Sequence, residues 1–250
     1  KTVNISESTV VRFATQLGFE GYIEFQKGLH ELIKSKLTSI QRVEVTSVRM
    51  SNNDILKKVL TSDIEMIKNT LNIISRESFK SAAEQINRAK KIYILGVRSA
   101  APLASFIYFY FNLIYDSVEL VDTQSESGIF EHIFKITDED VCIAISFPRY
   151  SKQIINALQF INSKGAKIIA ITDNENSPIA AFAHYILTAI SDMASFVDSL
   201  VAPLSVINAL IVAVSLKNKD EVFKKFRELE DVWDKYQVYE KLEEYDSDAK

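Results

Sequence analysis

From about residue 90 onward, short apolar strands alternate with helix-like segments, and this alternation constrains the fold more than any other feature. Strands are predicted at 91–95, 117–121, 141–145, 167–171 and 184–188, with helices at 100–114, 127–135, 151–164 and 178–183. Strand–helix units of this length favour a parallel sheet with helices on both faces. The sequence therefore predicts an α/β fold, doubly wound around a mainly five-stranded parallel sheet.

Two of the predicted strands run directly into turns that carry hydroxyl groups and an arginine. The first is followed by Arg98 and Ser99, and the third by Ser146, Arg149 and Ser151. Helix N-termini present unpaired N–H groups, and open α/β sheets bind ligands at the carboxyl ends of their strands. Arginines add charge-assisted hydrogen bonds to a phosphate or carboxylate. We therefore expect a site for a small anionic ligand at these turns.

The loop after the second strand ends at the same edge of the sheet, so its polar side chains are expected to contact the ligand as well. The alternative is that Ser99 and Ser151 only cap helices, while the arginines pair with Asp122, Glu126 or Glu131. The full set of expected ligand-binding residues is Gly96, Arg98, Ser99, Gln124, Ser125, Ser146, Arg149 and Ser151.

The N-terminal residues predict helices of a different kind. Ser6 is a suitable N-cap and Gly18 a suitable C′ residue for a helix over residues 7–17. An apolar stripe on this helix is expected to be buried; it consists of Val10, Phe13, Ala14 and Leu17. A second helix is predicted at 22–37, a polar linker at 38–50, and further helix at 53–87.

Composition narrows the class of protein. The chain has 250 residues, 47% hydrophobic and 25% charged, which is typical of a folded protein. Its net charge of −4 argues against broad affinity for nucleic acid. The whole of this net charge is carried by residues 219–250, which hold 7 Lys/Arg and 11 Asp/Glu, so the rest of the chain is formally neutral. A single cysteine, Cys142, excludes an internal disulfide, and the scattered histidines argue against a metal site. We expect no cofactor, no leader sequence and a cytoplasmic location.

Two apolar segments, 100–115 and 196–216, raise the question of a membrane span. The first is short for a span and the second contains Asp198, Pro203 and Asn208, so burial in a core or between subunits is expected for both. The last helix, predicted at 219–240, carries a narrow apolar seam that suits packing against another helix, either of this chain or of a second copy.

Residues 6–26, SESTVVRFATQLGFEGYIEFQ, resemble the second half of the helix-turn-helix domain of the RpiR (MurR/RpiR) family of bacterial transcription regulators. Residues 90–216 resemble the sugar isomerase (SIS) domain that follows it there. The resemblance implies four parts: a partial DNA-binding domain at 1–37, a helical linker at 38–88, an SIS domain at 89–218, and an acidic helix and tail at 219–250. It also implies operator DNA as a partner, a phosphorylated sugar or related anion as effector, and a homodimer or homotetramer.

The resemblance assigns the first helix to the major groove as the recognition helix. We then expect backbone contacts that position the helix on the DNA from Ser6, Ser8 and Thr9, and contacts to base edges from Arg12 and Gln16. The chain begins in what would be the second helix of that domain, which puts DNA binding by this chain alone in question.

The two anion loops depart from the family pattern. Arg98 stands where the common first loop has a second glycine. Pro148 and Arg149 stand where the common second loop has a serine and a glycine, while Ser146 and Ser151 match it.

Two other classes remain open. An aldose–ketose phosphate isomerase on the same fold needs a general base, for which the sequence offers Glu126, Glu131, His132 and His184. A purely structural oligomerisation module would bind no small ligand.

Overall fold

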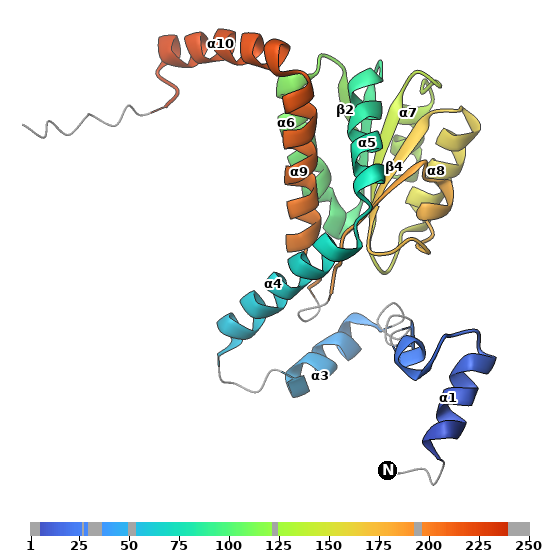
Figure 1. The fold of residues 1–250 in the computed structure, drawn as a ribbon. Helices are drawn as coiled ribbons and strands as arrows, with labels where there is room; N and C mark the ends of the chain where they lie inside the picture. The colour runs from blue at the N-terminus through green and yellow to red at the C-terminus, as the bar shows by residue number, and fades with distance from the viewer. Residues whose placement is uncertain are drawn as a thin grey trace, which may run out of the picture.

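A computed structural model describes residues 6–26, 28–29, 37–49, 54–121, 125–192 and 197–239, with the side chains of 46–49 left aside. Before residue 76 the described helices include α1 (Glu7–Gln16), α3 (Ser39–Arg49) and α4 (Ile55–Ile73). Residues 22–26 and 28–29 are also helical, within the helix predicted at 22–37, of which residues 27 and 30–36 lie outside the described residues. An α/β unit follows (Figure 1). Its elements are α5 (Arg76–Arg88), β1 (Ile92–Gly96), the 3₁₀ turn η1 (Arg98–Ala100), α6 (Ala101–Ile114), β2 (Val118–Leu120), α7 (Glu126–Ile133), β3 (Val141–Ile145), α8 (Lys152–Ser163), β4 (Lys167–Thr172), the 3₁₀ turn η2 (Ala180–Phe182), β5 (Tyr185–Thr188), α9 (Val201–Lys217) and α10 (Lys219–Tyr236).

The five strands form one sheet in the order β2-β1-β3-β4-β5, and every neighbouring pair is parallel. This confirms the predicted fold class. The chain moves outward from β1 to β2 and then crosses back to place β3 on the other side of β1. The strand order therefore reverses between β1 and β3, and such a reversal opens a crevice at the carboxyl ends of the two strands.

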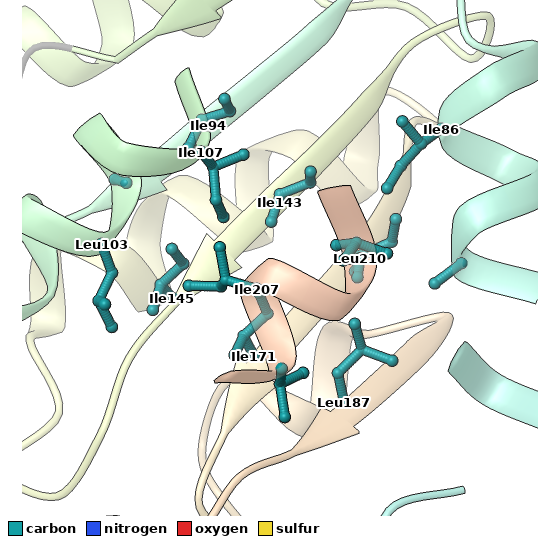
Figure 2. Close-up of a cluster of buried hydrophobic side chains, with 14 of the residues drawn as sticks. Ile86, Ile94, Leu103, Ile107, Ile143, Ile145, Ile171, Leu187, Ile207 and Leu210 are labelled. Atoms are coloured by element: carbon teal, nitrogen blue, oxygen red, sulfur yellow. The ribbon is translucent and has the colours of Figure 1, made fainter. Parts of the chain in front are cut away.

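Both faces of the sheet are covered, which explains why its central strands read as continuous apolar runs. On one face, Ile94, Ile143 and Ile145 are fully buried against α5, α6 and α9. Figure 2 shows these side chains packed against Ile107 and Ile207. The alternate residues of β1 and β3 face α7 and α8. Each such aliphatic side chain contributes roughly 1.5–3 kcal/mol on burial.

The segment that links the N-terminal helices to the sheet differs from the expectation. The polar stretch expected as a linker forms α3, whose N-terminus is stabilised by reciprocal hydrogen bonds between Thr38 and Gln41, a capping box. The helical segment expected over 53–87 is divided, because Ser75 caps a new helix, α5. Since α5 packs on β5 and α9, the hydrophobic core of the α/β unit begins before residue 89.

The first helix matches its predicted ends but not its predicted burial. Ser6 accepts a hydrogen bond from the Thr9 N–H, and Gly18 has φ +89°, as a C′ residue requires. Of the expected stripe only Ala14 is buried, whereas Phe13 is 51% exposed. The prediction of a buried stripe was wrong because, within the described residues, the ring contact of Phe13 is with Phe25 alone and no sheet lies beneath α1 (Figure 1).

The predicted helix at 178–183 is reduced to the single 3₁₀ turn η2. Both apolar segments that raised the question of a membrane bury one side in the core of the α/β unit, as α6 and α9. In the described part of the chain, no single helix has the length and apolar character for a membrane span, although α9 and α10 together, bent by 98°, pass the same test of length and composition.

Candidate functional site

A cavity of about 280 Å³ opens at the carboxyl ends of β1 and β3, where the strand order reverses. The turn after β1 and the turn after β3 form two of its walls. The remaining wall comes from α3 and from the residues just before α9. Its lining residues are Ser39, Arg42, Val97, Arg98, Ser99, Ala100, Ser146, Phe147, Pro148, Arg149, Ser151 and Asp198.

Five of the eight residues expected at the ligand lie in this lining: Arg98, Ser99, Ser146, Arg149 and Ser151. They are separated by some fifty residues in sequence, and the pairing of β1 with β3 brings them together. Their role in ligand binding stays a prediction.

Arg98 and Arg149 share an unusual backbone conformation. Their φ angles are +57° and +70°, in the left-handed region that favours glycine. The family pattern described above has glycine at both positions, a residue that adopts this conformation without strain. An L-residue pays roughly 1–2 kcal/mol for this conformation. A guanidinium held over a cavity at that cost points to a functional use of its charge.

Three of the four serines in the lining, Ser99, Ser146 and Ser151, have hydroxyl groups that no described residue engages, whereas the hydroxyl of Ser39 accepts a hydrogen bond from Arg149. Ser151 stands at the N-cap of α8, yet its side chain makes no capping hydrogen bond. Ser75, by contrast, caps α5 by accepting from the Ser78 N–H at 3.1 Å. Ser146 is buried at the end of β3, and only its backbone is bonded, to Ile171. The alternative in which Ser99 and Ser151 only cap helices is therefore not what the structure shows.

The arginines also do not form the pairs that the alternative required. Arg149 donates from Nη1 to the Ser39 hydroxyl at 3.0 Å. Glu126 accepts a hydrogen bond from Asn156 instead. Within the described residues Arg98 makes no ion pair and no side-chain hydrogen bond, and Asp122 lies outside them.

Sequence reasoning missed three polar lining residues, Ser39, Arg42 and Asp198. Arg42 is only 2% exposed and donates to Asp198 at 2.5 Å. Nothing in a polar segment expected as a linker distinguishes Arg42 from a solvated side chain. The one available signal was Asp198, an acidic residue beside an otherwise apolar segment. Three guanidinium groups and one carboxylate leave the lining with a formal charge of +2.

The other three expected ligand residues lie elsewhere. Gly96 does not line the cavity; a Cβ there would meet the Ala100 carbonyl oxygen at 2.8 Å, so the glycine allows the first turn of α6 to approach β1. Ser125 caps α7 by accepting from the Gly128 N–H at 2.9 Å. Gln124 lies outside the described residues.

Three of the four candidate general bases of an isomerase, His132, His184 and Glu126, make hydrogen bonds outside the cavity. His132 hydrogen-bonds Glu119 on the edge strand β2, which also pairs with Lys91. His184 accepts from the Ile168 N–H, and burial together with Lys167 lowers its pKa. Among the residues that the structure describes, no histidine or glutamate lines the cavity.

Cys142 lies in the middle of β3, where complete burial raises the pKa of its thiol to about 12. The described residues contain no cluster of three or more His, Cys, Asp or Glu side chains suited to a metal ion.

The residues expected at DNA lie together along α1. Arg12 and Gln16 are exposed on it, one turn apart. Ser8 and Thr9 are exposed at its start, where the Ser6 hydroxyl bonds both of their hydroxyl groups. This placement suits a helix whose first turns face a partner, and the DNA contacts stay a prediction.

Three-layer packing around a parallel sheet, with a positively charged cavity at the strand reversal, defines a domain of the doubly wound α/β class. The model of one family, the SIS domain, matches residues 85–213, which is more than half of the chain. The chain belongs to this family.

The chain is also similar to proteins described as transcriptional regulators. An uncharacterized HTH-type transcriptional regulator of Clostridium perfringens is 28% identical over 190 residues, which cover 75% of this chain and 67% of that protein. The chain thus spans about two thirds of the length of that relative.

Two solved structures share the fold. The sugar isomerase domain of an RpiR transcription factor from Sphaerobacter thermophilus has a TM-score of 0.68 and 24% identity, covering 71% of this chain and 99% of that one. The Vibrio vulnificus NanR protein complexed with ManNAc-6P has a TM-score of 0.64 and 18% identity, covering 91% and 81%. The resemblance to RpiR-type regulators with an SIS domain is confirmed.

Proposed function

We propose that this chain is the effector-sensing part of a transcription regulator, and that its cavity binds a phosphorylated sugar or a related anionic metabolite. One observation carries the proposal: serine hydroxyls and guanidinium groups from two separate turns converge without protein partners for most of them. Hydroxyls and N–H groups at helix starts hold phosphate oxygens, and arginines supply the compensating charge. The NanR structure with ManNAc-6P supports this class of ligand on this fold.

The charge of the lining favours a phosphomonoester over a monocarboxylate. A phosphate monoester carries about −1.5 to −2 charges at neutral pH, since its second pKa is near 6. That charge matches the formal +2 of the cavity, whereas a single carboxylate neutralises only half of it.

Binding of the anion is proposed to control operator binding by the N-terminal helices of a homodimer or homotetramer. A ligand shifts such an equilibrium only by its different affinity for the two arrangements. Operator binding places this work in the bacterial cytoplasm and requires no catalysis by the cavity. The positions of His132 and Glu126, both committed to structural hydrogen bonds, speak against an isomerase.

A thermal-shift screen tests the proposal. It compares sugar phosphates, including N-acetylmannosamine 6-phosphate, with their unphosphorylated parents, sugar acids and inorganic phosphate. A ligand at a hundred times its Kd stabilises the chain by about 2.7 kcal/mol, which raises Tm by several degrees. We expect the shift to need the anionic group.

Two serine variants serve as a matched pair. Ser151→Ala removes an unbonded hydroxyl and is expected to abolish the shift without lowering the ligand-free Tm. Ser75→Ala removes a true cap and is expected to cost about 1 kcal/mol of stability while keeping the shift. A shift that survives in Ser151→Ala, or no shift with any anion, would contradict the proposed site.

A further inference from the structure

The wall of the cavity that the two anion loops do not supply comes from α3, the helix that connects the N-terminal helices to α4 and the α/β unit. Ser39 and Arg42 lie one turn apart on α3, and both line the cavity. Figure 1 shows α1 and α3 beyond one end of the α/β unit, while α10 leaves from the other end. An anion in the cavity would therefore touch the N-terminal part of the chain directly.

Arg42 and Arg149 both make contacts that hold α3 at the cavity, and both side chains are suited to binding an anion. Arg42, almost completely buried, donates to Asp198 at 2.5 Å. Arg149 of the β3 turn donates to the Ser39 hydroxyl at 3.0 Å. A guanidinium has five N–H donors, so Arg42 can keep a bond to Asp198 and also donate to a phosphate oxygen.

We infer that Arg42 is a third anion-binding arginine, and that a phosphate group bound by the two loops clamps α3 onto the α/β unit through it. This inference rests on the proposed function. The bound phosphate joins the Ser99 and Ser151 turns to Arg42, so occupancy of the cavity strengthens the attachment of the linker helix. The position of α3 then carries the state of the cavity to the N-terminal helices.

In this arrangement Asp198 weakens the binding of an anion to Arg42. Its carboxylate compensates Arg42 in the empty cavity and repels a dianion that approaches the same guanidinium. The pair thus sets how strongly the cavity attracts an anion, and removing Asp198 raises that attraction.

Three variants distinguish the loss of the Arg42 side chain from a change in the formal charge of the lining. Arg42→Gln lowers the formal charge of the lining to +1, and Asp198→Asn raises it to +3. The double variant Arg42→Gln/Asp198→Asn keeps the formal +2 of the original lining and leaves no buried charge without its partner. It is therefore the decisive variant, and it avoids the misfolding that a lone buried carboxylate can cause.

The experiment titrates inorganic phosphate into the chain and its variants by calorimetry, and measures hydrogen exchange of α3 with and without phosphate. The exchange of α10, which lies at the far end, serves as the internal reference. In the original chain phosphate is expected to slow exchange in α3 but not in α10. Asp198→Asn is expected to bind phosphate about threefold to tenfold more tightly.

The double variant is expected to bind phosphate at least about tenfold more weakly than the original chain and to show no protection of α3. Equal affinity and equal protection in the double variant would overturn the inference, and so would phosphate binding to the original chain without any slowing of exchange in α3. Absence of phosphate binding in the original chain would instead overturn the proposed function.

Discussion

At the scale of single residues, two arginines in left-handed turns show how this SIS domain departs from the loops it resembles. Arg98 keeps φ +57° without any side-chain partner in the described residues. Within the part of the chain that the structure describes, no hydrogen bond or ion pair of the Arg98 side chain offsets the backbone strain. A bound anion is the natural source of the missing compensation, because it satisfies the guanidinium that the turn holds in place.

Comparing Arg98→Gly with Arg98→Ala tests this reading. Glycine relieves the left-handed strain and alanine retains it, while both remove the guanidinium. We expect Arg98→Gly to be more stable than Arg98→Ala by about 1 kcal/mol in denaturant unfolding of the ligand-free chain. Both are expected to weaken phosphate binding. Equal stability of the two variants would show that the turn carries no strain.

The same scale shows where sequence reasoning succeeds and where it ends. The serines and arginines of the two loops were predicted because each lies next to a strand in the sequence. Arg42 was not, because its place at the cavity depends on how α3 packs against residues near Asp198, more than 150 positions away. Gly96 was assigned to the ligand because glycine in such a turn serves either backbone approach or packing, and only the contact with Ala100 decides between them.

At the scale of elements, β5 is an edge strand whose outer backbone groups have no neighbouring strand to pair with. Ser78 on α5 provides hydrogen-bond partners for two of them. Its hydroxyl donates to the Ile186 carbonyl at 2.8 Å and accepts from the Ile186 N–H at 3.0 Å. Thr70 on α4 accepts from the Ile190 N–H just beyond the strand. The linker helices thus complete the sheet edge rather than merely connecting two domains.

Ser78→Ala should therefore destabilise the chain, since it leaves both backbone groups of Ile186 without their partner. We expect a loss of about 1–3 kcal/mol in unfolding free energy. Hydrogen exchange should localise the effect to β5. Ser163→Ala, which removes a hydroxyl bonded only within its own helix end, is the control and should cost much less. A uniform rise in exchange across the sheet would contradict the local role.

The opposite edge, β2, is held by a charge network that predicts a pH dependence. Burial alone would raise the pKa of Glu119, but hydrogen bonds from Lys91 and His132 outweigh it and lower that pKa. Burial alone would lower the pKa of Lys91, but its interactions, including the hydrogen bond to Glu119, outweigh burial, so the pKa of Lys91 is raised. The stabilisation from Glu119 is fully present above the ordinary carboxyl pKa and is lost as pH falls through the lowered value.

Glu119→Gln should thus be less stable than the original chain at neutral pH, by about 1–3 kcal/mol. Toward acid the two curves should converge, because protonation removes the same interaction from the original chain. Unfolding free energies measured from neutral pH down to about pH 3 check this. A difference that stays constant over the whole range would assign the loss to packing rather than to charge.

The elements also show what a sequence pattern can and cannot predict. All five strands were located closely. The three central strands are apolar runs buried on both faces, whereas β2 and β5 lie at the edges of the sheet, are partly buried, and were found from the turns that bound them. The division of the helical segment at Ser75 was missed, since apolar residues continue at helical spacing across the break. The predicted burial of Phe13 failed because burial depends on which partner covers a stripe, and periodicity does not contain that information.

At the scale of the whole molecule, one cavity lies where three parts of the chain meet. The strand reversal brings the turns after β1 and β3 together, and α3 completes the lining and leads to the N-terminal helices. The formal charge of +2 on the lining is the basis for the proposed binding of a dianion. The apolar seam of α10 was expected to pack either against this chain or against a second copy. Val222 at the start of the seam packs against the core of the α/β unit, whereas Tyr236 at its end is exposed. Lys225 also ties the helix to Asp116, at the end of the sheet opposite the cavity.

Amide NMR spectra of the isotope-labelled chain, recorded during a titration with inorganic phosphate and with the best sugar phosphate from the screen, test the central claim most directly. If phosphate binds in the cavity, we expect the first and largest chemical-shift changes at the turns 97–100 and 146–152, followed by those in α3. Shifts confined to other surfaces, or spectra unchanged by any phosphate compound, would contradict it.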